Sequence, residues 1–223
     1  MRVSLERMDH VAIQFKPRRA LILAPHTDDG EFGCGGSIAR FLEDGTEVFY
    51  VAFSICEESV PEGFKKDALA DEVRQATSTL GIPPKNLIIR SYPVRRFPDH
   101  RQEVLEDLVR IRAEVSPDLV FLPCSHDIHQ DHQVIAAEGL RAFKTATLLG
   151  YEVPWNNLTM NFSTLVVINE GHLEKKLAAL ACYKTQGHRY YAKEGMIRSL
   201  AQSRGLLVWQ KYAEAFQLIR LVV

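Results

Sequence analysis

The sequence has few cysteines, no long apolar run and almost no net charge. The four cysteines, Cys34, Cys56, Cys124 and Cys182, are widely spaced and form no C-x-x-C pair, which favours a reduced, cytoplasmic chain. No apolar stretch approaches the roughly 20 residues that a membrane helix needs. The segment 1–20 also lacks the apolar centre of a signal peptide. We therefore expect a cytoplasmic protein without a membrane span.

The charge balance argues against nucleic acid as a partner. The chain has 27 Lys and Arg residues against 28 Asp and Glu residues, a net charge of -1. Without an excess of positive charge there is no general attraction for a phosphate backbone. A chain of 223 residues that is 46% hydrophobic can bury a full core without disulfides, so we predict one domain. We also expect it to form a homo-oligomer.

Short aliphatic runs alternate with segments of helical period along most of the chain. The predicted strands are 20–24, 47–53, 87–89, 119–122, 147–153 and 164–168. The predicted helices are 31–42, 67–80, 101–115, 133–143, 173–183 and 195–203, followed by an apolar end at 216–223. This alternation is typical of β-α units around a parallel sheet.

Histidines and acidic residues follow two of the predicted strands. His26, Asp28 and Asp29 come directly after the strand 20–24, and the stretch 126–132 follows the strand 119–122. In an open α/β sheet, ligands bind beyond the carboxyl ends of the strands. We therefore expect both clusters to lie at one site.

Three of these side chains form a suitable ligand set for a divalent metal ion. Imidazole and carboxylate suit Zn²⁺, and a hydrolytic site typically has three protein ligands and a water molecule. We predict His26, Asp29 and His132 as the ligands, because His26 and Asp29 are three residues apart at a loop-to-helix junction and can face one ion. Fe²⁺ or another divalent ion suits the same ligands.

The neighbouring residues suit the chemistry of a hydrolase. Asp28 would take a proton from a water molecule that the metal activates. His129 would stabilise a developing oxyanion or polarise the substrate carbonyl, and Asp131 would orient His129. A solvated polar loop and an aspartate helix cap are the alternatives for the separate clusters. Their coincidence favours a metallohydrolase.

The stretch 26–36 resembles the H-P-D-D-x-E-x-G-x-G-G signature of the LmbE-like, or PIG-L, zinc-dependent N-acetylglucosaminyl deacetylases. The stretch 129–132 resembles their second motif, H-x-D-H, and the resemblance extends from about Ala20 to about Phe216. Two positions differ: Thr27 replaces the usual proline, and Leu69 stands where the family often has an arginine.

The resemblance implies a Rossmann-like three-layer α/β fold with a mostly parallel central sheet and helices on both faces. It implies one zinc ion bound by His26, Asp29 and His132, with Asp28 as general base and His129 as electrostatic stabiliser or acid. The expected reaction is removal of an N-acetyl group from a GlcNAc-like sugar or sugar conjugate. The whole chain, 1–223, would be a single deacetylase domain, in which 20–145 carries the metal site and 146–223 completes the substrate pocket.

Other functions remain open at this point. The same ligands suit a metal-dependent amidohydrolase that acts on another small N-acyl substrate, or a non-catalytic metal- or ligand-binding module. Three loops are candidates for substrate contact, with a solvated loop or a surface charge pair as the alternative. The stretch 57–59 would contact a hydroxyl or amine, the two arginines of 92–97 would suit an anionic substrate, and 188–191 would offer hydrogen-bond donors and stacking rings. His126 is a further candidate pocket residue, and the glycines at 33–36 are expected to allow close helix packing.

Overall fold

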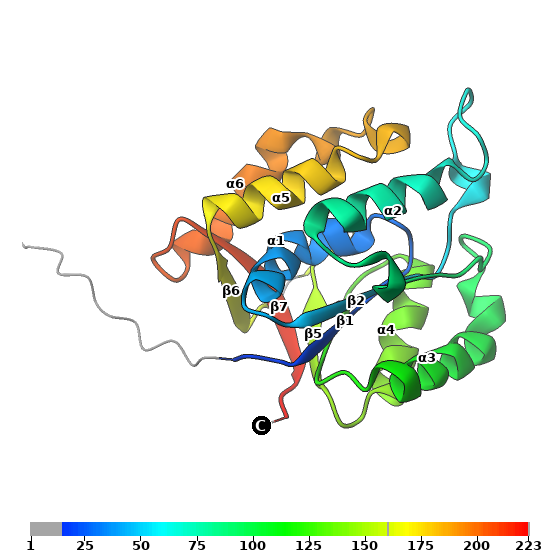
Figure 1. The fold of residues 1–223 in the computed structure, drawn as a ribbon, viewed down its shortest axis with the longest axis horizontal. Helices are drawn as coiled ribbons and strands as arrows, with labels where there is room; N and C mark the ends of the chain where they lie inside the picture. The colour runs from blue at the N-terminus through cyan, green and yellow to red at the C-terminus, as the bar shows by residue number, and fades with distance from the viewer. Residues whose placement is uncertain (1–14, 160, 223) are drawn as a thin grey trace, which may run out of the picture.

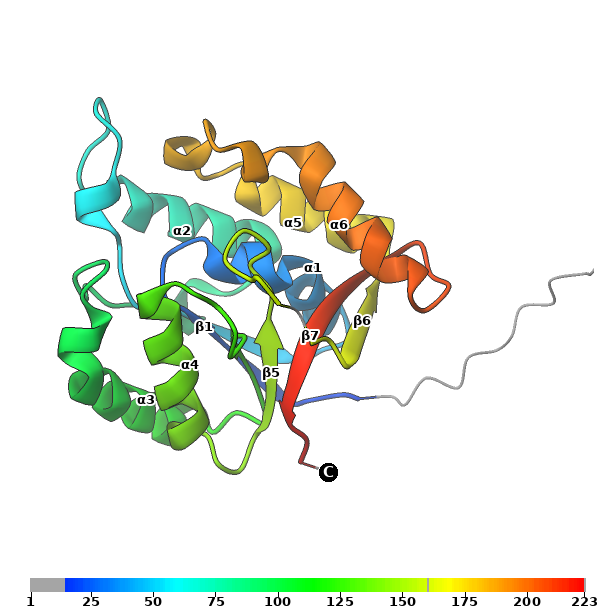
Figure 2. The ribbon, with the colours of Figure 1, turned by 180° about the vertical axis from the view of Figure 1, so that it is seen from behind.

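The computed structural model describes residues 15–159 and 161–222. Seven strands form one sheet: β1 Arg19–Ala24, β2 Glu47–Ala52, β3 Leu87–Ile89, β4 Leu119–Pro123, β5 Thr147–Tyr151, β6 Thr164–Ile168 and β7 Tyr212–Arg220. Their order across the sheet is β3-β2-β1-β4-β5-β7-β6. The first five strands of that order are parallel, whereas β7 runs antiparallel to both β5 and β6 (Figure 2).

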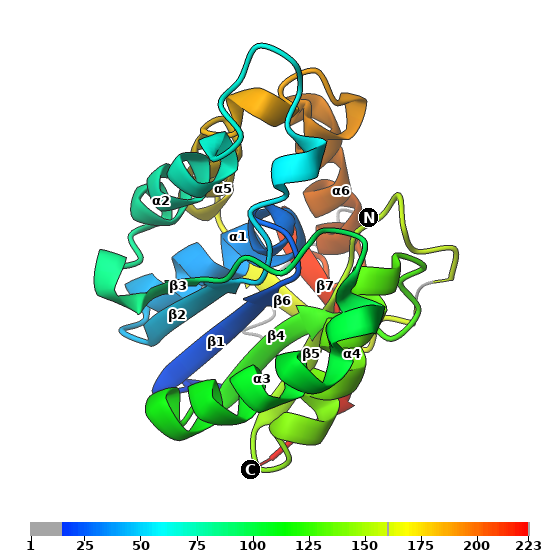
Figure 3. The same cartoon turned by 90° about the vertical axis from the view of Figure 1, so that its right-hand side faces the viewer.

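Helices cover both faces of the sheet (Figures 1 and 3). One face carries α1 Asp29–Glu43, α2 Ala68–Leu80, α5 Glu170–Leu180 and α6 Glu194–Leu206. The other face carries α3 Arg101–Val115 and α4 Gln130–Ala142. The predicted three-layer α/β fold is confirmed. Within the described ranges, no helix combines the length and apolar character that a membrane crossing requires.

The central strand β1 is buried on both faces, which explains its uninterrupted apolar sequence. Ala20, Ile22 and Ala24 belong to the core on the α1 side, and Leu21 and Leu23 belong to the core on the α3 side. All five residues are 0% exposed. This packing fixes the carboxyl end of β1, from which the first polar cluster leaves.

The glycines of α1 let this helix lie against the sheet. A Cβ atom at Gly33 would overlap the ring of Tyr151, and one at Gly36 would lie 2.6 Å from Ile168 Cδ1. Both contacts would be too close for real atoms, so side chains at these two positions would push the helix away from the sheet. Cys34 is buried in the same helix, and its thiol donates a hydrogen bond to the Gly30 carbonyl. The glycines therefore place the start of α1 close to the strand ends.

Candidate metal centre and catalytic pocket

The two polar clusters meet because β1 and β4 are neighbouring parallel strands. His26 lies in the turn after β1, Asp29 is the first residue of α1, and His132 lies in the first turn of α4. The backbone N–H of His26 donates to Asp29 Oδ2 at 2.8 Å, which closes the turn between them. The sheet thus brings together residues more than a hundred positions apart.

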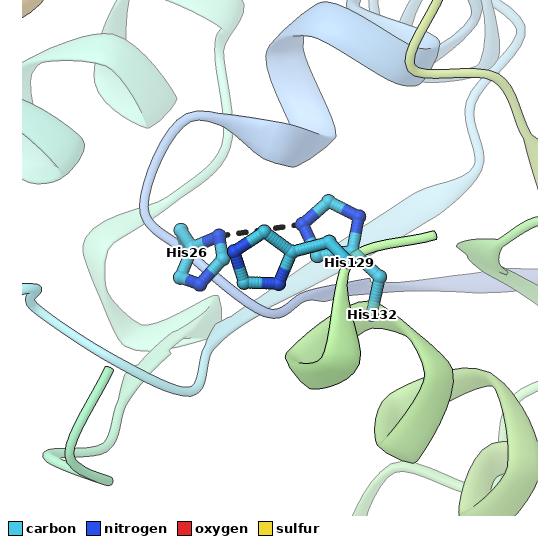
Figure 4. A group of neighbouring side chains, drawn as sticks. All are labelled: His26, His129 and His132. Carbon is cyan, nitrogen blue, oxygen red and sulfur yellow. Dashed lines mark hydrogen bonds between the residues drawn. The ribbon is translucent and has the colours of Figure 1, made fainter. Parts of the chain in front are cut away.

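Three potential ligand atoms converge on one point. His26 Nδ1 and His132 Nε2 each lie 3.1 Å from Asp29 Oδ2. The two nitrogens lie 3.3 Å from each other (Figure 4). Ligands placed 2.0–2.1 Å from a tetrahedral zinc ion are separated by roughly 3.4 Å. The predicted set of His26, Asp29 and His132 therefore fits a divalent metal ion.

The far nitrogen of each ligand histidine contacts a carboxylate. His26 Nε2 lies 3.0 Å from Asp131 Oδ2, and His132 Nδ1 lies 2.7 Å from Asp127 Oδ2. Each carboxylate holds a hydrogen on the nitrogen that it faces, so the lone pair of the opposite nitrogen points to the convergence point. This arrangement fixes the tautomer that a metal ligand needs.

The electrostatics of the centre favour a positive charge. Burial alone would lower the pKa of His26, but Asp29 and Asp131 outweigh it and raise the value to about 9. The pKa of His132 is likewise raised to about 10, because Asp29 and Asp127 outweigh burial. Burial would raise the pKa of Asp29, yet the two histidines bring it well below its usual range. A cation at this point, whether protons or a metal ion, is therefore stabilised.

Asp28 borders the same centre but is not one of the three residues, His26, Asp29 and His132, that form the ligand triangle. It lines the pocket and precedes α1 without making a side-chain capping bond to the described residues. Burial, and then repulsion from Asp29, raises the pKa of Asp28 to about 7. A carboxyl group with this pKa can accept and release a proton near neutral pH.

His129 is placed to donate a hydrogen bond into the pocket. It caps α4, and its Nδ1 accepts the backbone N–H of Asp131 at 3.2 Å. In the neutral ring, the hydrogen must then sit on Nε2. Burial, and then the positive charges of His26 and His132, lower the pKa of His129, which favours the neutral form.

The ligand atoms of His26, His129 and His132 lie within 4.8 Å of one another, so a centre of three histidines is an alternative (Figure 4). Asp29 fits the third position better than His129 does, because Asp29 Oδ2 lies 3.1 Å from both other ligand atoms. The Nδ1 of His129 is already engaged by a backbone N–H.

The contacts of Asp131 differ from the prediction that it orients His129. Its carboxylate contacts His26 Nε2 and accepts the backbone N–H groups of Arg95 at 2.6 Å and Phe97 at 3.2 Å. Its link to His129 is through its own backbone N–H. The side chain of Asp131 points toward His26 and away from His129 and His132, because residues one and two positions apart in a helical turn face different directions. The contact between Asp127 and His132 Nδ1 was likewise not predicted.

A buried cluster that the motifs did not reveal supports the turn after β1. Tyr50 accepts the N–H of Gly30 at 3.1 Å, and the hydroxyls of Tyr50 and Tyr183 lie 2.9 and 2.7 Å from the Thr27 carbonyl. Both hydroxyls also contact Glu31, which is 0% exposed. Burial is the main reason that the pKa of Glu31 rises to about 8. These tyrosines hold the turn in place with Thr27 at the position usually occupied by proline.

The pocket beside the centre has a volume of about 320 Å³. One wall is aromatic: the rings of Trp155 and Tyr191 stack at 3.8 Å with 16° between their planes, and Phe32 meets both edge-on. Trp155 was missed in the sequence, although it follows β5 and so leaves the same sheet edge as the two motifs. Arg95 and Arg189 also line the pocket.

Only some of the loop residues that were candidates for substrate contact line the pocket. Ser59, Arg95, Arg189 and Tyr191 line the pocket. His126 is exposed and lies outside the pocket lining, as do Glu57, Glu58, His188 and Tyr190.

The part of the chain that carries both polar clusters matches a known protein family. A family profile described as PIG-L, GlcNAc-PI de-N-acetylase, matches residues 21–143, more than half of the sequence. The chain is 25% identical over 181 residues to a protein named uncharacterized deacetylase YaiS from Escherichia coli (strain K12). That match covers 76% of this chain and 92% of the relative.

Two solved structures share the fold. N,N'-diacetylchitobiose deacetylase from Pyrococcus horikoshii, in complex with an inhibitor, matches with a TM-score of 0.77 at 23% identity, covering 91% of this chain and 84% of that one. The 4-carboxy-2-hydroxymuconate hydratase from Pseudomonas putida KT2440 matches with a TM-score of 0.76 at 19% identity, covering 92% and 98%. A fold shared by a deacetylase and a hydratase does not by itself decide the reaction. The family match, which includes both polar motifs, does decide the family: this chain belongs to the PIG-L family of de-N-acetylases.

Proposed function

We propose that this protein removes the acetyl group from an N-acetylated amino sugar by metal-dependent amide hydrolysis, with zinc as the metal. The observation that carries the proposal is the convergence of His26 Nδ1, Asp29 Oδ2 and His132 Nε2 within 3.3 Å of one another. Asp28 and His129 line the adjoining pocket. The names of the matching family and of the relatives support a deacetylase.

The bound ion supplies Lewis-acid chemistry, which makes water a stronger nucleophile at neutral pH. Asp28 is the general base in this proposal, because its carboxyl lines the pocket beside the three proposed ligands without being one of them. The same carboxyl then carries that proton to the leaving nitrogen, which departs as an amine. Acetate is the second product.

His129 donates its Nε2 hydrogen to the carbonyl oxygen as negative charge develops there. The backbone N–H of Asp131 keeps this tautomer in place, since it occupies Nδ1. The aromatic wall of Trp155 and Tyr191 offers an apolar surface to the face of a sugar ring. Aromatic side chains combined with a few polar groups are the usual lining of a small-molecule site.

The test is acetate release from free, glycoside-linked, lipid-linked and nucleotide-linked N-acetyl sugars, measured with chelated protein and with protein reconstituted with Zn²⁺ or Fe²⁺. We expect release that requires the added metal. Absence of acetate from every substrate, with metal bound at full occupancy, would contradict the proposal and favour another N-acyl substrate or a binding role.

Asp28→Asn separates catalysis from metal binding. We expect turnover to fall about 10²- to 10⁴-fold, because that is the typical contribution of a general base. Metal content should stay at the wild-type level, since Asp28 is outside the ligand triangle. His126→Ala is the control, because His126 lies in the loop between β4 and α4 but outside the pocket lining, and it should keep wild-type turnover. An Asp28→Asn protein with full turnover would exclude Asp28 as the base.

A further inference from the structure

We propose that the substrate carries a negatively charged group, a phosphate or a carboxylate, which Arg95 and Arg189 bind at the mouth of the catalytic pocket. This inference rests on the proposed deacetylase function and names the substrate class. The two arginines come from distant parts of the chain, the loop after β3 and the connection between α5 and α6, yet both line the pocket of the metal centre.

The position of Arg95 is tied to the metal centre. Its backbone N–H donates to Asp131 Oδ2 at 2.6 Å, and the same carboxylate oxygen contacts the ligand His26. Its backbone has a positive φ of 67°, a conformation in which glycine is far less strained than arginine. A residue with a long cationic side chain thus occupies a strained position in the pocket lining.

The guanidinium groups of both arginines are available to a ligand. Arg95 lies 3.8 Å from Glu58, but the two side chains are 55% and 68% exposed, so water screens this pair and it is weak. Arg189 is exposed and forms no ion pair with the residues that the structure describes. An anionic ligand would therefore displace little when it binds either group.

Arg189 also lies close to the aromatic wall of the pocket. The aromatic wall includes Tyr191, two positions after Arg189. Burial raises the pKa of the Tyr191 phenol, as do Asp28 and Asp29, whereas the charge of Arg189 lowers it. One ring thus feels both the carboxylates of the centre and the guanidinium at the mouth. A sugar on this wall with its acetamide toward the metal would extend its other substituents toward the arginines.

The charges inside the pocket do not need these arginines. Asp29 and Asp28 can balance a divalent ion, and the carboxylates of Asp127 and Asp131 are engaged by the ligand histidines. Guanidinium groups form paired, charge-assisted hydrogen bonds with phosphate and carboxylate. The positive charge at the mouth therefore selects the substituent of the substrate, while the interior acts on the acetamide.

The test compares metal-reconstituted protein on matched neutral and anionic substrates: N-acetylglucosamine, its 1-phosphate, its 6-phosphate and N-acetylmuramic acid. We expect kcat/KM to be highest for one of the anionic sugars. The position of its negative charge, and whether it is a phosphate or a carboxylate, would identify the group that the arginines bind. Arg95→Gln and Arg189→Gln should each reduce the ratio of anionic to neutral kcat/KM by roughly tenfold, mainly through KM, since a charged hydrogen bond contributes about that much. High salt should reduce the same ratio in the wild type.

Arg96→Gln is the matched control. Arg96 is the neighbour of Arg95, its side chain is 70% exposed and paired with Asp99, and it lies outside the pocket lining. We expect this variant to leave every ratio unchanged. Equal kcat/KM for neutral and anionic sugars, or equal effects of Arg96→Gln and Arg189→Gln, would overturn the inference.

Calorimetric binding of the same four sugars separates this inference from the proposed function. If no sugar is deacetylated but the anionic ones bind more tightly, and Arg189→Gln removes the difference, then the arginine site stands and the deacetylase proposal falls. If turnover occurs but neither binding nor kcat/KM depends on the charge, the deacetylase proposal stands and the arginine site falls.

Discussion

Two of the buried charged clusters among the described residues contact α1, and they differ in how their atoms are paired. In the first, Lys176 Nζ lies 2.6 Å from Glu214 Oε1 and 2.7 Å from the Phe32 carbonyl. Glu214 also accepts the backbone N–H groups of Gly36 and Ser37 and the Ser37 hydroxyl. Every donor in this cluster meets an acceptor.

In the candidate metal centre, three potential ligand atoms meet at one point instead. Two imidazole nitrogens and a carboxylate oxygen lie 3.1 to 3.3 Å apart. Burial of polar groups is common to both clusters and indicates no function by itself. Convergence of three potential ligand atoms on one point, beside a pocket, is the feature that distinguishes this centre from the paired cluster.

The largest test of this difference is removal of two ligands. In His26→Ala/His132→Ala we expect loss of bound metal and of measurable turnover, because one ligand of the triangle remains. The measurement is metal content by mass spectrometry together with acetate release. Full metal occupancy in this variant would place the metal elsewhere in the chain.

Lys176→Met tests the other cluster. The side chains of Lys176 and Glu214 are 6% and 5% exposed, so the variant leaves a buried carboxylate without its counter-charge. We expect the free energy of unfolding to fall by about 3–5 kcal/mol. Denaturant titration measures this change, and metal content per folded molecule should match the wild type. A variant that loses metal while keeping its stability would erase the distinction between the two clusters.

Asp127→Asn sharpens the comparison within the centre. Asp127 holds the hydrogen on His132 Nδ1 from 2.7 Å, and loss of such a partner typically weakens metal affinity by about 10- to 100-fold. Competition with a chelator gives the affinity. Asp107→Asn is the control, because Asp107 is a buried carboxylate that pairs with Arg90 and Arg110 away from the centre. The hypothesis fails if both variants bind metal like the wild type.

Glu31→Gln should change the pH profile of stability. The folded-state pKa of Glu31 is raised from 4.5 to about 8, so its protonated form contributes stability below about pH 4.5 that is lost as the pH rises through 8. The glutamine variant cannot ionise, so it should lose less stability than the wild type between pH 5 and about pH 9. Thermal unfolding across this range measures the difference, and parallel profiles would exclude a neutral Glu31.

The strands and helices of the parallel part were accessible from the sequence because their patterns are local. The strand 87–89 and the helix 101–115 agree with the structure at both ends. The helix predicted to start at 133 begins at Gln130, because His129 caps it with a side-chain bond that hydropathy does not encode. Of the apolar end predicted at 216–223, residues 216–220 belong to β7, which begins at Tyr212, and residue 223 lies outside the described residues. Its place between β5 and β6 depends on pairings distant in sequence.

For the site, the sequence allowed the residues to be grouped but not their side-chain contacts to be assigned. The side chains at the two strand ends could be grouped because parallel topology brings those ends together. Asp131 could not be assigned to His26, nor Tyr50 to the turn at Thr27, because such contacts are set by side-chain directions across different elements. The aromatic wall required the course of two loops after β5 and α5, which no periodic pattern specifies.

The pairing of β1 with β4 also makes the metal centre a reporter of folding. His26 and His132 are separated by 106 residues, so their ligand atoms meet after a long loop of chain has closed. Such non-local pairings form late relative to helices, which depend on local contacts. During refolding, uptake of a spectroscopically visible ion such as Co²⁺ should therefore follow the recovery of helical circular dichroism, and its rate would time the closure of the central strand pair.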